Sequence, residues 1–252
     1  MAVGYNPRIV TDKLVFCVDV ANTKSYPGSG TTWYDLSGNG YNGTMSDVTI
    51  TSDGHMSFNG QNPGSAVAFP ESNISKDPSL YLGGSSGGFT YECWVNKQGE
   101  NHNPTIAARI MSTDISDYNG IVWLGSSHAN HPNKLQFYYD GNLQTGTNVR
   151  SSSTLSTNTW YHIVCTCDAS LTTDNIKIYI NGEEDISKDF ANDSDFGSGT
   201  SKVFAIASNA ESAVAYDNGL NGYIDICRIY GKPLSSDEVK QNFNALRRRY
   251  EI

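Results

Sequence analysis

The sequence lacks the features of a membrane protein or of a domain held together by disulfides. No window approaches eighteen apolar residues, and the opening MAVGYNPRIVTDKLVF has no apolar core long enough for a signal peptide. The cysteines are odd in number and have no zinc-ribbon spacing. All five lie in strand-like runs, at Cys17, Cys93, Cys165, Cys167 and Cys227. We therefore expect reduced, buried cysteines, no membrane contact and folding in a cytoplasm.

Positive charge is also scarce. The chain has 17 Lys and Arg against 26 Asp and Glu, a formal net charge of -9, and its basic run is confined to Arg247–Arg249. An acidic surface repels phosphate backbones, so we do not expect nucleic acid as a partner. Since the three arginines end a predicted helix, where cations suit the helix dipole, we interpret them as helix-end charges.

Convincing helical periodicity is present in one stretch, near the end of the sequence. Apolar residues recur there at i, i+4, i+7 and i+11. They form an apolar stripe along one face of a helix, and this face must pack against another part of the domain. The stripe consists of Val239, Phe243, Leu246 and Tyr250. Ser235 stands three residues before Glu238, the spacing of a capping box. The sequence therefore predicts one short helix over 235–250 that docks on the rest of the domain.

The remainder has the pattern of short strands separated by turns. Asp140-Gly141 and Asn181-Gly182 each end such a run with the dipeptide that accepts a type I′ hairpin. The predicted strands are 13–20, 56–58, 66–69, 89–96, 106–111, 120–124, 134–140, 160–167, 176–181, 203–207 and 222–230. With no repeat and no linker composition, we expect one all-β domain over residues 1–252. Its predicted architecture is a two-sheet antiparallel jelly-roll β-sandwich with a short C-terminal α-helix.

An ordered series of phrases runs through nearly the whole chain. They are LVFCVDVANTKSYPGSGTTWYDLSGNGYNGT (14–44), MSFNG (56–60), FTYECWVN (89–96), TWYHIVCTCD (159–168), IKIYINGEE (176–184) and GYIDICRIYGKPLSSDEVKQNFNALRRRY (222–250). Together they resemble the laminin-G-like, concanavalin A-like family of lectin and glucanase jelly rolls. SYPGSGTTWYDLSGNGYNG and NFNALRRRY are similar to versions found in tailed-bacteriophage structural proteins.

The resemblance raises the question of catalysis. Glycan hydrolysis needs two carboxylates about 5–10 Å apart across a cleft, and glucanases of this fold carry them on one strand as Glu-x-Asp-x-x-Glu. The sequence lacks that motif. Glu183-Glu184-Asp185 follows a turn and is interpreted as a solvated hairpin arm, and Glu92 stands alone between Tyr91 and Cys93. We therefore expect no enzyme activity.

The resemblance also implies a structural calcium ion at a sheet rim, held by acidic residues near the first and last strands. Calcium prefers hard oxygen ligands, including backbone carbonyls at glycine turns. The matching residues are Asp19 and Asp225, with Asn59 and Gly60 as neighbours. In the alternative interpretation, the two aspartates cap turns or pair with Arg228 or Lys13.

Glycan binding in such folds uses aromatic faces beside polar side chains. The candidates form two groups along the chain. They are Trp123, His128, Tyr138 and Tyr139 in one group, and Trp33 and Tyr34 in the other. Fifteen tyrosines suit an exposed recognition surface, but any one aromatic can instead fill the core.

Two functions follow as hypotheses. The first is a non-catalytic virion surface protein of a bacteriophage, either a capsid decoration protein or a tail or fibre adhesin, made in the host cytoplasm. Its partners would be other virion proteins and cell-surface glycans, and we expect a homo-oligomer because virion components usually assemble symmetrically. The second is a carbohydrate-binding module of a bacterial extracellular protein or glycoside hydrolase.

Overall fold

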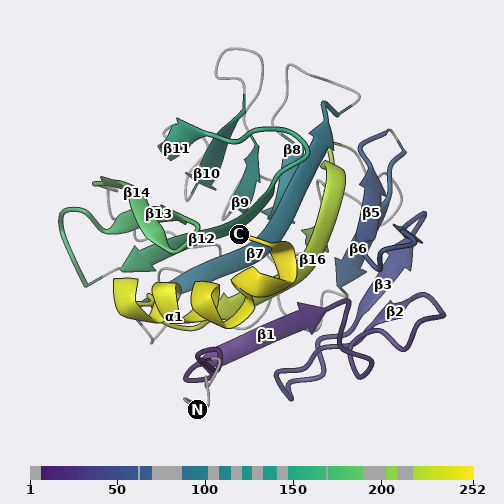
Figure 1. Cartoon of the computed structure of the whole chain (residues 1–252). Coiled ribbons are helices and arrows are strands. Elements are labelled where there is room, and N and C mark those ends of the chain that lie inside the picture. Colours follow the sequence, from purple (N-terminus) through teal and green to yellow (C-terminus); the bar gives the residue numbers. More distant parts are fainter. Residues whose placement is uncertain are drawn as a thin grey trace.

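Two antiparallel sheets form the body of the described structure (Figure 1). The structure is a computed structural model that describes residues 7–61, 63–69, 87–101, 108–114, 121–126, 133–140, 147–168, 170–189, 203–208 and 218–252. Sheet A has the order β14 (Glu183–Lys188), β13 (Ile176–Ile180), β12 (Trp160–Asp168), β7 (Gly88–Gly99), β16 (Asn221–Tyr230), β5 (Met56–Asn59) and β4 (Thr49–Ile50), and β1 (Leu14–Asp19) also pairs with β16.

Sheet B has eight strands. Their order is β11 (Thr147–Thr154), β10 (Lys134–Asp140), β9 (Ile121–Ser126), β8 (Ala108–Asp114), β15 (Val203–Ile206), β6 (Ala66–Phe69), β3 (Gly43–Ser46) and β2 (Thr32–Trp33). The predicted fold class, an all-β antiparallel sandwich with one short C-terminal helix, is confirmed.

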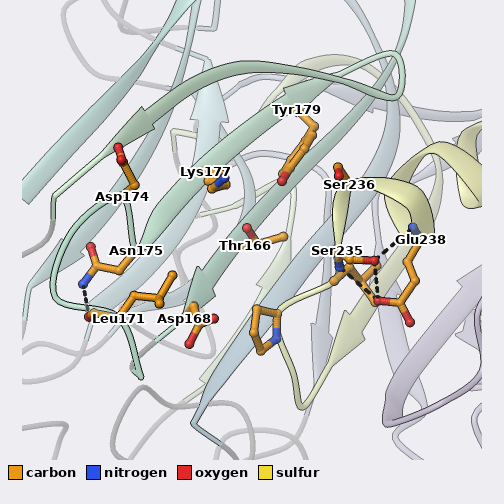
Figure 2. Close-up of a pocket in the computed structure, with 12 residues that line it drawn as sticks. Thr166, Asp168, Leu171, Asp174, Asn175, Lys177, Tyr179, Ser235, Ser236 and Glu238 are labelled. Carbon is orange, nitrogen blue, oxygen red and sulfur yellow. Dashed lines mark hydrogen bonds between the residues drawn. The ribbon is translucent and has the colours of Figure 1, made fainter.

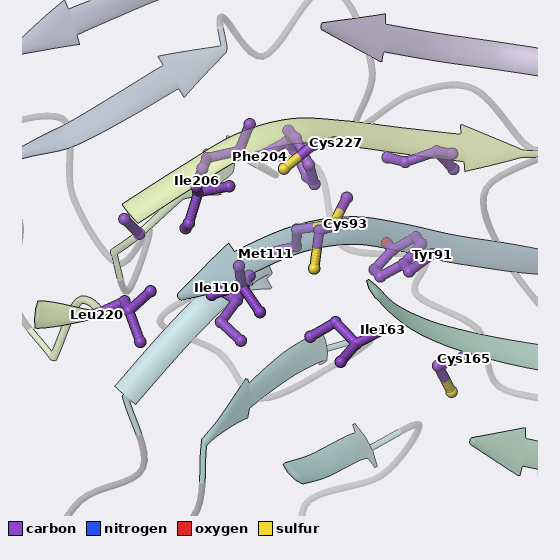
Figure 3. Packing of buried hydrophobic residues seen from close by; sticks show 14 of the residues in the cluster. Tyr91, Cys93, Ile110, Met111, Ile163, Cys165, Phe204, Ile206, Leu220 and Cys227 are labelled. Carbon is purple, nitrogen blue, oxygen red and sulfur yellow. The ribbon is translucent and has the colours of Figure 1, made fainter. Parts of the chain in front are cut away.

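The core lies between the sheets because alternate residues of the central strands face inward. Cys93 of β7 and Cys227 of β16 are register partners, and both belong to the main buried cluster. Figure 3 shows them near Phe204 and Ile206 of β15, in sheet B. All five cysteines are free and buried, so that prediction is confirmed.

The outer face of sheet A is also covered, because a helix lies across it (Figure 1). The helix α1 runs over Ser236–Leu246 and continues as a 3-10 turn, η3, over Arg247–Tyr250. The capping box between Ser235 and Glu238 is present as predicted. Tyr250 stacks on Trp94 of β7, with ring centroids 4.2 Å apart and an interplanar angle of 14°. No helix among the described residues is long and apolar enough to cross a membrane.

The hairpin between β13 and β14 confirms one turn prediction and links to the helix. Asn181 and Gly182 have φ of 52° and 82°, as a type I′ turn requires. A Cβ added at Gly182 would lie 2.9 Å from the ring of Phe243, so glycine lets the turn approach α1 closely. The other predicted turn includes Gly141, which lies outside the described residues.

Candidate ligand site at the rim of sheet A

An ion-pair cluster joins the ends of the chain at one rim of sheet A. Asp19 is the last residue of β1 and pairs in register with Ile226, while Asp225 sits at an irregularity of the β16 register. Arg249 of η3 bridges the two carboxylates. Its Nη1 lies 2.7 Å from Asp19 Oδ1, and its Nη2 lies 3.6 Å from Asp225 Oδ2.

His55 is fixed beside this cluster by contacts on several sides. Its Nδ1 lies 2.7 Å from Asp225 Oδ2. Its ring is stacked on Tyr223 at 5.7 Å between centroids and lies 4.9 Å from the ring of Trp160. Burial raises the pKa of the Asp225 carboxyl, against the opposing effects of His55 and Arg249. The imidazole is therefore held in one orientation by a buried carboxylate and two rings.

A pocket of about 470 Å³ opens beside the cluster. Three segments form it: the loop that follows β1, the tip of the β4–β5 hairpin, and η3. The lining residues, named the rim pocket below, are Val20, Ala21, Thr23, Tyr26, Pro27, Gly28, Ile50, Asp53, Gly54, His55 and Arg249. Gly54 has φ of 85°, and its N–H donates to the carbonyl of Thr51 at 3.0 Å, which closes the tip of the hairpin.

A second pocket, of about 310 Å³, lies where α1 begins above β12 and β13 (Figure 2). Tyr179 and Thr166 line it from the strands, and Glu238 lines it from the start of the helix, with its carboxylate turned toward Ser235. The acidic groups here already have partners. Glu238 completes the capping box and pairs with Lys232, and Asp168 Oδ1 accepts from the N–H of Ser170.

Beneath α1 lies a buried polar network that sequence reasoning missed. Glu92 has no second carboxylate beside it in this network, but three other side chains contact its carboxylate. They are Arg228, His162 with Nε2 at 3.1 Å, and Asn242 with Nδ2 at 2.7 Å. Glu92 and Arg228 are register partners on the neighbouring strands β7 and β16. The sequence alone does not show that these two strands are neighbours. The network ties the helix to the sheet and is closed to solvent.

A family model described as the concanavalin A-like lectin/glucanases superfamily matches residues 84–240. The chain belongs to this superfamily. A search of curated proteins finds no match.

Several solved structures have a similar fold. Domain 4 of an extracellular arabinanase from Geobacillus stearothermophilus, in complex with arabinotriose, is 20% identical with a TM-score of 0.63, over 91% of this chain and 98% of that one. A structure of botulinum neurotoxin type C, whose cell entry is described as dependent on interaction with two ganglioside molecules, is 16% identical with a TM-score of 0.63, over 94% of this chain and 52% of that one.

A third similar structure is the Trypanosoma rangeli sialidase in complex with sialic acid. It is 12% identical with a TM-score of 0.63, over 93% of this chain and 33% of that one. This chain therefore spans about half of the toxin chain and a third of the sialidase chain. At these identities, the likeness shows the fold alone.

The residues predicted to bind calcium are only partly brought together. Asp19 and Asp225 meet at Arg249, but Asn59 pairs with Asn221, four residues from Asp225 along β16 and thus roughly 13 Å away. Asn59 Oδ1 accepts from the N–H groups of Gln61 and Ser65 instead. Asn59 therefore lies apart from the Asp19–Asp225 pair.

Calcium binding itself stays a prediction. Within the part of the chain that the structure describes, no group of three or more His, Cys, Asp or Glu side chains could hold a metal ion. Chelation tests the prediction directly: a melting temperature that falls on adding EDTA would support a structural ion, and an unchanged one would contradict it.

The structure places the residues predicted to bind glycans in different environments. Trp33 is fully buried in the main core cluster, so it offers no face to a ligand, whereas its neighbour Tyr34 is 42% exposed. Trp123 and Tyr138 are backbone register partners on β9 and β10, and Tyr139 follows on β10. His128 lies outside the described residues. The rim pocket instead draws its rings from His55 and Tyr26, which the sequence did not single out.

Proposed function

We propose that this chain is a non-catalytic, lectin-like module that binds glycans through the rim pocket, displayed on the surface of a bacteriophage virion. The observation that carries the proposal is the pocket itself. Its volume of about 470 Å³ lies within the range of small-molecule sites. Val20, Pro27 and Ile50 give it apolar surface, and Thr23 and Asp53 give it groups that can exchange hydrogen bonds with hydroxyls.

The superfamily supports a sugar as the ligand class. The arabinanase domain, which has nearly the same length as this chain, is described in complex with arabinotriose. The other similar structures are described with gangliosides and with sialic acid. Sugars present C–H faces and hydroxyl edges together, which suits a pocket with apolar walls and a few polar groups.

The contacts of the acidic residues support the absence of catalysis. Most glycoside hydrolases use two carboxylates that flank the scissile bond across an open cleft. Glu92 is buried and paired with Arg228, and the carboxylates of Asp19 and Asp225 share Arg249. In the exposed strand β14, Glu183 pairs with Lys240 and Glu184 with Lys177.

The placement on a virion is supported by the two phrases similar to tailed-phage structural proteins, SYPGSGTTWYDLSGNGYNG and NFNALRRRY. A carbohydrate-binding module of a bacterial extracellular enzyme is the second candidate, favoured by the match to the whole arabinanase domain. Both share the glycan site and differ in assembly. A closed oligomer in solution favours the virion component, and a monomer favours the accessory module.

Glycan screening with a matched pair of variants tests the proposed site. Ile50 and Leu171 are both exposed aliphatic side chains, at the rim pocket and at the second pocket respectively. We expect Ile50→Ala to weaken binding of any glycan found on an array about tenfold, and Leu171→Ala to leave it unchanged. An array on which the purified protein binds no glycan would contradict the proposed function.

A further inference from the structure

We infer that the rim pocket selects a neutral sugar residue and rejects carboxylated sugars such as sialic and uronic acids. This inference rests on the glycan-binding function proposed above and narrows its ligand class. The reasons lie in how the charges around the pocket are already paired and in which hydrogen-bonding groups face the ligand.

The cation of the pocket is already balanced. Among the lining residues that the structure describes, Arg249 is the one Lys or Arg. Asp19 Oδ1 and Asp225 Oδ2 lie 2.7 and 3.6 Å from its two amino nitrogens. A guanidinium that recognises a ligand carboxylate does so through two parallel N–H bonds. Here each amino group faces one of the protein's own carboxylates, so the charge of the Arg249 guanidinium is already balanced before a ligand carboxylate arrives.

His55 does not supply a replacement cation for such a ligand. Its Nδ1 lies 2.7 Å from Asp225 Oδ2, so any positive charge on the ring would be neutralised by the same buried carboxylate. Asp19 and Asp225 thus pair with the one guanidinium, Asp225 also contacts the imidazole, and the carboxylate of Asp53 lines the same pocket. The net charge around the pocket is therefore negative or neutral, and the formal net charge of the whole chain is -9.

Asp53 places a negative charge at the mouth of the pocket. It is exposed at the tip of the β4–β5 hairpin, directly beside Gly54. An ionised carboxylate is an acceptor with two oxygens, so it can receive hydrogen bonds from adjacent hydroxyls of a sugar ring. The same group repels a ligand carboxylate, and a like charge placed against a binding site acts as a specificity element.

The apolar wall completes the selection. Val20, Pro27 and Ile50 line the pocket together with Tyr26, whose side chain also packs on the core. These groups suit the C–H face of a pyranose or furanose ring. A neutral sugar therefore meets complementary surfaces, with hydroxyls toward Asp53 and Thr23 and carbon toward the wall.

The test compares matched neutral and carboxylated oligosaccharides, such as lactose against sialyllactose and galactan against galacturonan fragments of equal length. Binding of the full chain is measured at about 50 mM salt, where unscreened charges act most strongly. We expect at least about tenfold tighter binding of the neutral member of a pair. Asp53→Asn should reduce the discrimination, and Asp53→Lys should abolish or reverse it. Asp174→Asn, at the second pocket, is the control and should change neither affinity nor preference.

The outcomes separate this inference from the function on which it rests. Equal or tighter binding of carboxylated sugars would overturn the inference and leave glycan binding standing. Preference for neutral sugars that Asp53→Lys does not alter would overturn the assignment to the rim pocket. No binding of either class would overturn the inference and the proposed function together.

Discussion

Glu92 is a carboxylate that stays ionised although it is closed to solvent. Burial alone would raise its pKa, but Arg228, His162 and Asn242 more than offset that effect and lower the pKa of Glu92 to about 2. Asn242 also joins α1 to the N-terminal segment, because its Oδ1 accepts from the N–H of Val10 at 2.7 Å. One buried charge therefore organises contacts from two strands, the helix and the segment before β1.

The shifted pKa predicts how stability depends on acid. The folded protein binds the Glu92 proton only near pH 2, whereas the unfolded chain binds it near 4.5. The stabilisation is therefore fully present above about pH 4.5 and is lost as pH falls toward 2, by on the order of 3 kcal/mol. The Glu92 carboxyl resonance, followed by NMR from pH 6 downward, should titrate near 2. Titration of this resonance near 4.5 would contradict the network.

At the candidate site, the sequence could predict some residues and not others. Asp19 and Asp225 were named because the family resemblance implies acidic residues near the first and last strands, and they do meet at one rim. Arg249 was interpreted as a helix-end charge, because nothing local shows that η3 returns to β1. His55 was overlooked because its partner lies 170 residues away along the chain. When two side chains meet only because distant strands are neighbours in the sheet, the sequence around each of them carries no periodic pattern that indicates the contact.

At the scale of elements, α1 shows how one buried face fixes a helix. Val239 is fully buried against Val164, Tyr179 and Tyr230, on the outer face of sheet A. Its neighbour Lys240 is exposed and pairs with Glu183. The helix is amphipathic, so these adjacent positions separate packing from surface effects.

We expect Val239→Ala to lower the free energy of unfolding by about 2 kcal/mol, because two buried carbon atoms and their contacts are lost. Lys240→Ala should change it by less than about 0.5 kcal/mol. Urea unfolding monitored by tryptophan fluorescence measures both. Equal effects of the two substitutions would mean that α1 is not docked by this face.

The edge of sheet B is protected by a residue from sheet A. β11 pairs with β10 and has no second neighbour in the strand order. Asp185 of β14 accepts from the N–H of Ser152 at 2.5 Å and from that of Ser153 at 3.0 Å. A charged residue that occupies the free N–H groups of an edge strand blocks pairing with another chain.

Asp185→Ala should therefore promote self-association of the folded protein. We expect a higher scattered intensity than wild type after incubation near the melting temperature. Glu184→Ala removes the same charge from the same strand but breaks only a surface pair with Lys177, so it serves as the control. Similar aggregation of both variants would attribute the effect to net charge instead of to the blocked edge.

Elements with strong periodicity were predictable and weak ones were not. The capping box and apolar stripe gave α1, and aromatic or β-branched runs gave β7, β12 and β16. β11, with the sequence TNVRSSST, was missed because polar residues dominate it and its register comes from β10. The short β2, β3 and β4 were missed because glycine-rich turns leave two to four residues each, too few for an alternation to show.

For the whole molecule, the open question is assembly. A virion component should have a solution mass that is a whole multiple of the chain mass, because such proteins form closed symmetric oligomers. Light scattering of the purified protein, over a range of concentrations, should give that multiple without a monomer fraction. A monomer at every concentration would contradict the homo-oligomer and favour the accessory-module hypothesis.

The position of β16 has a consequence for how the protein is made. This strand comes near the end of the sequence, at residues 221–230, yet it lies in the middle of sheet A. It pairs with β7 on one side and with β1 and β5 on the other. During synthesis, β1 and β5 must wait without that neighbour until residues 221–230 have left the ribosome. Sheet closure should then be late and slow, since it depends on contacts between distant parts of the chain. A chaperone that binds nascent strands would therefore stay bound longest to the first 60 residues.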